Sequence, residues 1–182
     1  APKDLTELAE MMVTALALDR PVALRYPRGS GARPPREDSR ALPVGRAQVL
    51  RDGHGVVIVA LGAMVERALA AAALLAEEGM APAVVNARFL RPLDEDLICA
   101  LAHDCGQVVT VENSCLGGFG SAVGEMLHRR GLQTPLLSLG LPDAFIQHGN
   151  RETLLARVGL DPAGIAQRVS AFVRSGAGSF AP

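Results

Sequence analysis

Arg28 lies in a motif whose residue types suit phosphate binding. The motif reads "RYPRG" from Arg25 to Gly29 and lies at the carboxyl end of a short β-prone run, Val22 to Tyr26. Ligands of open α/β sheets bind at the carboxyl ends of strands. Pro27 stiffens the backbone before Arg28 and Gly29 lets it turn at once, so the guanidinium would be presented with little freedom to lose. The N–H donors of this guanidinium could bind a phosphate or form an interdomain ion pair equally well, and spacing alone does not distinguish the two.

A glycine-rich segment, "LGGFGSAVG", follows a buried strand pattern and opens a helix. Backbone amides and the helix dipole can receive an anion at such a place. The spacing departs from the dinucleotide fingerprint, because Gly118 and Gly120 supply its first two glycines but Val123 holds the third position, and no Walker lysine follows. We expect a tight turn that packs against a partner subunit, with a phosphate site as the alternative. Contact between the Gly117–Gly120 loop and a cofactor is left open.

The other side chains capable of catalysis are scattered. The four histidines, at 54, 103, 128 and 148, show no metal-ligand spacing. His148, near Asp143, is the histidine that could touch a site, whereas Cys115 has no histidine base nearby and no G-x-S-x-G elbow occurs. Glu112 ends a strand and is expected to be an interface carboxylate, with an acid or base role as the alternative. We therefore expect no catalytic, cofactor-binding or metal-binding residues in this chain.

The first elements that position Arg28 form only part of a domain. Asp4 and Glu7 mark the start of a helix over about 5–18, in which apolar residues at 5, 8, 9, 12, 13 and 16 recur at helical spacing, and the strand over 22–26 follows. One helix and one strand cannot bury their apolar faces alone. The chain starts without a methionine or a leader pattern, which we interpret as an internal start. Four prolines, three glycines and several charges over 27–45 then predict a linker.

From residue 47 onward, strand and helix patterns alternate. We expect strands over 47–50, 56–61, 83–86, 108–112 and 135–139, and helices over 64–78, 94–103, 121–130, from 151 and from 162. The Asp52-Gly53 pair favours a tight reversal, so the first two strands are expected to form a hairpin. The repeated strand-helix order requires parallel pairing with right-handed crossovers. The sequence therefore predicts an α/β fold with a doubly wound, mostly parallel sheet.

Composition excludes two classes of partner. Eighteen basic and 19 acidic residues give a net charge of −1, so no global field attracts nucleic acid or an acidic membrane. The longest apolar runs fall far below the ~20 residues of a membrane span. Three cysteines without C-x-x-C spacing indicate the reducing cytoplasm and not a disulfide framework.

Five motifs, in order, resemble the C-terminal third of the 1-deoxy-D-xylulose-5-phosphate synthase family. They are "YPRG" at 26–29, "LPVGRAQVLRDG" at 42–53, "NARFLRPLDEDLI" at 86–98, "VVTVENSCLGGFGSAV" at 108–123 and "GLPDAFIQHG" at 140–149. The resemblance runs from residue 1 to about 174. Transketolases and pyruvate dehydrogenase beta-type subunits share parts of this layout without "YPRG" in this form. They remain alternatives, as does a non-catalytic dimerisation or regulatory module.

The resemblance implies three segments: residues 1–30 as the end of a pyrimidine-binding domain, 31–46 as an interdomain linker and 47–182 as a transketolase C-terminal domain-like unit. It implies a homodimeric transferase that uses thiamine diphosphate and Mg²⁺. This enzyme condenses pyruvate with D-glyceraldehyde 3-phosphate, releasing CO₂, in isoprenoid precursor, thiamine and pyridoxal biosynthesis. The family's YPRG arginine holds the acceptor's phosphate, a role that falls to Arg28. The cofactor-binding and proton-moving residues belong to the remainder of the enzyme, so this chain alone is expected to be inactive.

Overall fold

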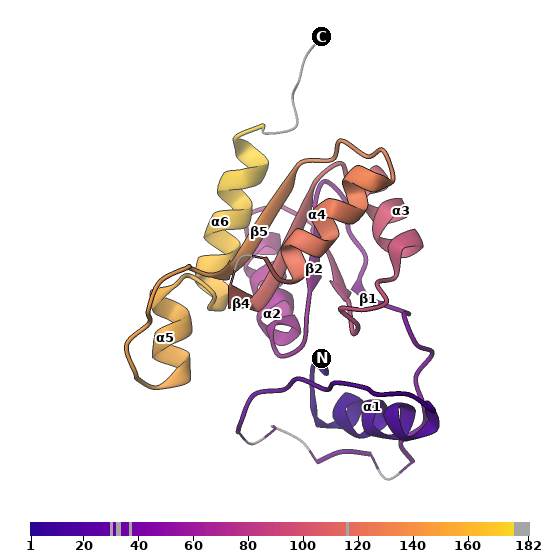
Figure 1. Ribbon diagram of the computed structural model, residues 1–182. Coiled ribbons are helices and arrows are strands. Elements are labelled where there is room, and N and C mark those ends of the chain that lie inside the picture. Colours follow the sequence, from indigo (N-terminus) through magenta and orange to yellow (C-terminus); the bar gives the residue numbers. More distant parts are fainter. Residues whose placement is uncertain (30, 32–33, 37, 116, 177–182) are drawn as a thin grey trace.

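The computed structural model describes residues 1–29, 31, 34–36, 38–115 and 117–176, which form two parts of unequal size (Figure 1). The helix α1 (Leu5–Ala17) and the chain that follows it lie below a larger unit built on a sheet. No helix among the residues described is long and apolar enough to cross a membrane.

One five-stranded sheet organises the larger unit. Its strands are β1 (Gln48–Arg51), β2 (Val57–Ala60), β3 (Ala83–Asn86), β4 (Val108–Cys115) and β5 (Leu136–Leu141). Their order is β1-β3-β2-β4-β5. β2 is parallel to both β3 and β4, and β4 is parallel to β5, whereas β1 is antiparallel to β3. The prediction of a mostly parallel sheet is confirmed.

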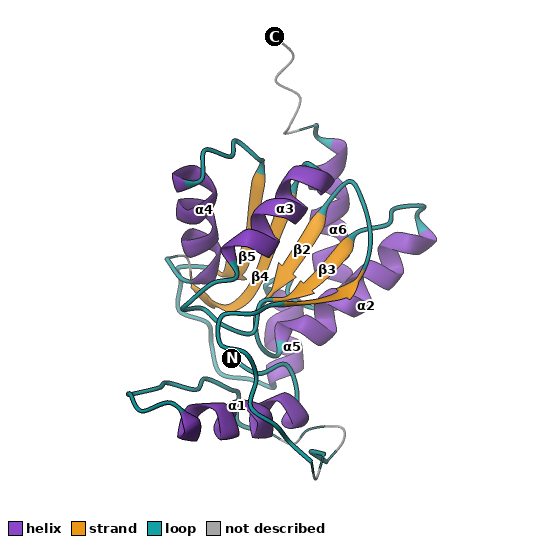
Figure 2. Cartoon of the chain, turned by 90° about the vertical axis from the view of Figure 1, so that its right-hand side faces the viewer, coloured by secondary structure: helices purple, strands orange, loops and turns teal. Residues whose placement is uncertain are grey.

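Helices cover both faces of this sheet (Figure 2). The helices α2 (Met64–Glu77), α5 (Arg151–Arg157) and α6 (Pro162–Arg174) pack on one face. The helices α3 (Glu95–Cys105) and α4 (Phe119–Arg129) pack on the other. Alternate residues of the central strands enter the two cores, with Ile58 in one and Val57 in the other. Burial on both faces is why these strands are continuous runs of small aliphatic residues.

The predicted hairpin between the first two strands is wrong. β1 pairs with β3, and Gln48 lies opposite Asn86. The Asp52-Gly53 turn instead crosses the start of β3, where the nitrogen of His54 donates to the carbonyl oxygen of Ala81 at 2.7 Å. A Cβ on Gly53 would lie 2.3 Å from this same oxygen. The glycine therefore allows two backbones to pass closely and does not reverse the chain.

The predicted strand over Val22–Tyr26 is also absent, since residues 21–27 form no helix or strand. A strand exists only when a neighbour satisfies its backbone groups. No described segment pairs with these residues. Their sequence supplies β-propensity, but the ladder needs a partner strand.

The predicted first helix is confirmed, but its buried face is not the apolar one. Asp4 caps α1 by accepting a hydrogen bond from the nitrogen of Glu7 at 2.7 Å. The buried residues of α1 are Glu7, Met11 and Thr14. Of its apolar residues, Leu16 is 87% exposed and Met12 is 51% exposed. The part of the apolar face at Met12, Val13 and Leu16 is therefore exposed in the described structure, whereas Leu5 and Leu8 are half-buried.

The helices near the carboxyl terminus begin where their caps predict. Asn150 caps α5 and Asp161 caps α6 through side-chain oxygens. The Arg67 guanidinium donates to both carboxylate oxygens of Glu152 at 2.7 Å, which connects α2 to α5. This hydrogen bonding lowers the pKa of the Glu152 carboxyl.

Candidate functional site

Arg28 lies in the chain that follows α1 and is exposed. Its side chain forms neither a hydrogen bond nor an ion pair with any residue that the structure describes. Gly29 beside it has open space where a Cβ would be. The Arg28 guanidinium thus has no hydrogen-bond acceptor among the described protein groups.

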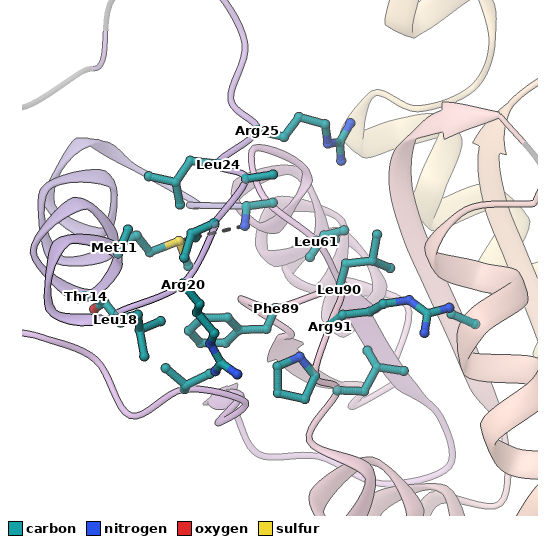
Figure 3. Close-up of a pocket in the computed structure, with 18 of the residues that line it drawn as sticks. Met11, Thr14, Leu18, Arg20, Leu24, Arg25, Leu61, Phe89, Leu90 and Arg91 are labelled. Atoms are coloured by element: carbon teal, nitrogen blue, oxygen red, sulfur yellow. Dashed lines mark hydrogen bonds between the residues drawn. The ribbon is translucent and has the colours of Figure 1, made fainter.

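Arg25, three residues earlier, makes one of the contacts between the two parts of the chain. Its Nη1 donates to Oδ1 of Asn113 at 3.0 Å. Asn113 belongs to the carboxyl-terminal end of β4. Figure 3 shows the Arg25 guanidinium pointing away from α1. The "RYPRG" motif is therefore attached to the sheet unit at the carboxyl-terminal end of β4, and not at the end of a strand of its own as the sequence predicts.

A cavity of about 930 Å³ separates the chain after α1 from the sheet unit (Figure 3). Its wall on the sheet side includes Leu61, which follows β2, and Phe89, which follows β3. Its wall on the other side includes Leu18 and Leu24. Four arginines also line it: Arg20, Arg25, Arg91 and Arg129. Arg28 does not belong to the lining, so this cavity and the "YPRG" arginine are separate features.

The amino terminus of α4 is occupied by a carboxylate of the chain itself. Glu112, 5% exposed, accepts hydrogen bonds from the nitrogens of Phe119 at 2.9 Å and Gly120 at 2.8 Å. The hydroxyl of Ser114 donates to it as well. A Cβ on Gly118 would lie 2.5 Å from Oε2 of Glu112. The glycines make room for this carboxylate, so the alternative of a phosphate site at these amides is wrong.

The predicted role of Glu112 as an interface carboxylate is also wrong. Its carboxylate is buried and caps the start of α4 within the chain. The tight turn expected of the loop is confirmed by its contacts with Glu112. Contact of the loop with a partner subunit stays a prediction, and Leu116 lies outside the described residues. A negative charge suits this position because the helix dipole is positive there.

A second buried carboxylate, Glu7, was not anticipated. It is 0% exposed and accepts from Nδ2 of Asn86 at 2.8 and 3.0 Å and from Nε of Arg88 at 2.8 Å. The nitrogen of Lys3 donates to it at 2.8 Å. Arg88 also donates through Nη2 to Oε1 of Gln48 at 2.9 Å. We call these residues the Glu7 cluster; it connects α1 to the ends of β1 and β3.

The sequence contained one signal for this cluster. Glu7 shares a helix stripe with Met11 and Thr14, a different stripe from the apolar one, so two faces of α1 have reason to be buried. Its partners lie 79 and 81 residues further along the chain. Spacing carries no information on contacts across such separations.

The remaining candidates do not gather around Arg28. His148 and Asp143 are exposed, and the structure brings neither into a hydrogen bond with another described residue. Cys115 is exposed and has the carbonyl of Pro142 at 3.9 Å from its sulfur. In the described part of the chain, no three His, Cys, Asp or Glu side chains are placed to hold a metal ion.

Comparison with known proteins gives a consistent set of relatives. Residues 45–165 match the family model "Transketolase, C-terminal domain". The 1-deoxy-D-xylulose-5-phosphate synthase of Chlorobium luteolum is 50% identical over 178 residues, which is 96% of this chain and 28% of the relative. That of Thermomicrobium roseum is 52% identical over 176 residues, 95% of this chain and 28% of the relative. The chain thus spans about 28% of the length of these relatives.

Solved structures show the same fold. A chain described as a split gene transketolase in an inactive beta4 tetramer superimposes with a TM-score of 0.83 at 34% identity, covering 95% of this chain and 56% of that one. A transketolase of Pichia stipitis superimposes with a TM-score of 0.54 at 20% identity, covering 71% of this chain and 18% of that one. The second likeness is one of fold alone.

Proposed function

Because the chain belongs to the transketolase C-terminal domain family, we propose that it is the C-terminal part of a 1-deoxy-D-xylulose-5-phosphate synthase. The observation that carries the proposal is identity of about 50% to named synthases over about 95% of the chain. Residues 1–30 would complete a middle, pyrimidine-binding domain, 31–46 would be the linker and 47–182 the C-terminal domain.

The complete enzyme would join pyruvate to D-glyceraldehyde 3-phosphate with release of CO₂, as a homodimer in the cytoplasm. Thiamine diphosphate, bound with Mg²⁺, would supply the electron sink for decarboxylation. The described residues do not fit this cofactor: they hold no metal cluster, and the amides at the start of α4 are taken by Glu112. We assign the cofactor to the remainder of the enzyme, as the resemblance implies, and derive no step of this chain that involves it.

Within this reaction, Arg28 would bind the phosphate of the acceptor. Its exposure and the open space at Gly29 support the assignment, since a dianion must approach the guanidinium from outside. Arg25 takes the contact with the sheet unit, so the ion-pair alternative for Arg28 has no support among the described residues. A guanidinium fork suits a phosphate because it donates two parallel charged hydrogen bonds.

Two features support the need for a remainder. The apolar face of α1 is exposed at Met12, Val13 and Leu16, and residues 21–27 have β-propensity but no partner strand. The split gene transketolase chain, which resembles this one, is described as inactive in its beta4 form. We therefore expect this chain to be inactive without the remainder.

An assay of the complete polypeptide tests the proposal. With thiamine diphosphate and Mg²⁺, it should release CO₂ from pyruvate in an amount that matches consumed glyceraldehyde 3-phosphate. A transketolase would instead transfer a two-carbon unit from a ketose phosphate without consuming pyruvate. A pyruvate dehydrogenase beta-type subunit would consume pyruvate without using the aldehyde. A non-catalytic module would do none of these.

A further inference from the structure

We propose that the sheet unit, residues 47–176, positions Arg28 by holding the segment that carries it at two points. The first point is the buried Glu7 cluster, and the second is the hydrogen bond between Arg25 and Asn113. This inference rests on the proposed role of Arg28 as the ligand of the acceptor's phosphate. Glu7, Arg88 and Asn113 would be positioning residues, because they act through Arg28 and do not touch the substrate.

The Glu7 cluster fixes α1 in one place. A fully buried carboxylate is tolerated only when donors surround it, and Glu7 has them from Asn86, Arg88 and Lys3. Arg88 adopts a left-handed backbone with φ of 58°, which is unfavourable for a residue with a side chain. Its bonds to Glu7 and Gln48 hold that conformation. Sliding α1 along the sheet unit would leave these charges buried without partners.

The second point, the hydrogen bond between Arg25 and Asn113, attaches the "RYPRG" motif itself to the sheet unit. Asn113, which accepts from Arg25, follows Glu112 directly, and Glu112 is fixed by the two amides at the start of α4. The acceptor for Arg25 is therefore the direct neighbour of an anchored residue, within the stretch of β4 between Val111 and Cys115 where the register with β5 is irregular. Arg25 lies three residues before Arg28, with the stiff Pro27 between them.

The chain on both sides of Arg28 depends on these attachments. Residues 18–29 contain no helix or strand, so no local hydrogen-bond ladder sets where Arg28 lies. On the far side, the nitrogen of Leu42 donates to the hydroxyl of Thr14 at 2.7 Å, which returns the linker to α1. A displacement of α1 would thus move the chain at residue 18, where α1 ends, and at Leu42, which is bonded to Thr14.

The chemistry makes this positioning specific to the phosphate. Charged hydrogen bonds need a well-defined geometry, and small misplacement of a binding group reduces rates strongly. Pyruvate and the cofactor are assigned to the remainder of the enzyme, so loosening either point should leave them unaffected. The expected signature is a loss of preference for a phosphorylated over an unphosphorylated acceptor.

The test uses the complete enzyme and the ratio of kcat/KM for D-glyceraldehyde 3-phosphate to kcat/KM for D-glyceraldehyde. Arg28→Ala should lower this ratio by about 10- to 100-fold. Glu7→Gln should lower it by about tenfold, and Asn113→Ala by about threefold, with the KM for pyruvate unchanged in both. Combined with Arg28→Ala, neither substitution should lower the ratio further, because the phosphate contact is already gone.

Arg67→Met is the matched control, because it breaks an ion pair between α2 and α5 away from both points, and it should leave the ratio unchanged. The inference is overturned if Glu7→Gln or Asn113→Ala lowers the ratio by the same factor in the Arg28→Ala background as in the unaltered enzyme. It is also overturned if neither substitution lowers the ratio in the unaltered enzyme. If Glu7→Gln does not give folded enzyme, Arg88→Lys replaces it and is judged by the same ratio. An inactive complete enzyme, or an unchanged ratio in Arg28→Ala, would instead refute the proposed function of the chain or of Arg28.

Discussion

At the scale of single residues, the buried carboxylates of Glu112 and Glu7 fix how α4 and α1 contact the sheet unit. Glu112 neutralises the positive end of α4 from the strand that precedes it. Glu7 acts differently: it accepts hydrogen bonds from Asn86 and Arg88 and so connects α1 to the end of β3. Both are less than a tenth exposed, so each depends on its donors for the stability of its charge.

Replacing Glu112 should therefore destabilise the fold. Glu112→Ala leaves the amides of Phe119 and Gly120 without their acceptor and should lower the free energy of unfolding by about 2–4 kcal/mol. Urea unfolding of the chain measures this. Glu125→Ala, at an exposed position of the same helix, is the control and should change the value by less than about 0.5 kcal/mol. Equal effects of the two substitutions would contradict the capping role of Glu112.

At the scale of elements, α4 approaches the sheet closely because of Gly120. A Cβ there would lie 2.6 Å from Oγ of Ser138 and 2.8 Å from Oγ1 of Thr110. At Gly124, one turn further, the nearest atom to a Cβ would be Cδ2 of Leu136 at 3.1 Å. Ser138 and Thr110 are short strand side chains that cannot move far, whereas the Leu136 atom is the end of a longer, flexible side chain.

These two glycines should respond in opposite directions to the same change. Gly120→Ala overpacks the interface between α4 and the sheet and should lower the free energy of unfolding by about 1–3 kcal/mol. Gly124→Ala should raise it by up to about 1 kcal/mol, since alanine has the higher helix propensity and Leu136 can move aside. Thermal or urea unfolding of both variants decides, and destabilisation by Gly124→Ala as large as that by Gly120→Ala would refute this account of the interface.

Local patterns were sufficient for most elements of the sheet unit. Asn150 and Asp161 mark helix starts because each side chain bonds a backbone nitrogen within its own turn. The position of β1 was not predictable in this way. A two-residue turn signal at Asp52-Gly53 has the same sequence whether the chain reverses or crosses a neighbouring strand end, and only the contact with Ala81 distinguishes them.

The candidate site was predicted only in part for the same reason. Arg28 is singled out because its motif is continuous in the sequence, and its role stays a prediction. The occupation of the α4 amides by Glu112 was missed, although Glu112 lies seven and eight residues before them, because the glycines alone are compatible with any anion. Glu7 was missed because its partners are distant along the chain.

At the scale of the whole molecule, Met12, Val13 and Leu16 of α1 are exposed, and under the proposed function the remainder of the polypeptide would cover them. Leu16→Glu should leave the stability of this chain alone unchanged, because Leu16 is 87% exposed in it. In the complete polypeptide, the same substitution should cost about 2 kcal/mol, the value of a buried leucine. Unfolding of both forms measures the difference. Ala73→Glu, on the exposed side of α2, should be neutral in both, and an equally small effect of Leu16→Glu in both would show that nothing covers this face.

The most direct test of the account is the steady-state kinetics of Arg28→Ala in the complete enzyme. Loss of charged hydrogen bonds worth about 1.5–3 kcal/mol should raise the KM for D-glyceraldehyde 3-phosphate by about 10- to 100-fold. The KM for pyruvate should be nearly unchanged, because the contact that is lost involves only the acceptor's phosphate. A KM for the phosphorylated aldehyde equal to that of the unaltered enzyme would contradict the assignment of Arg28.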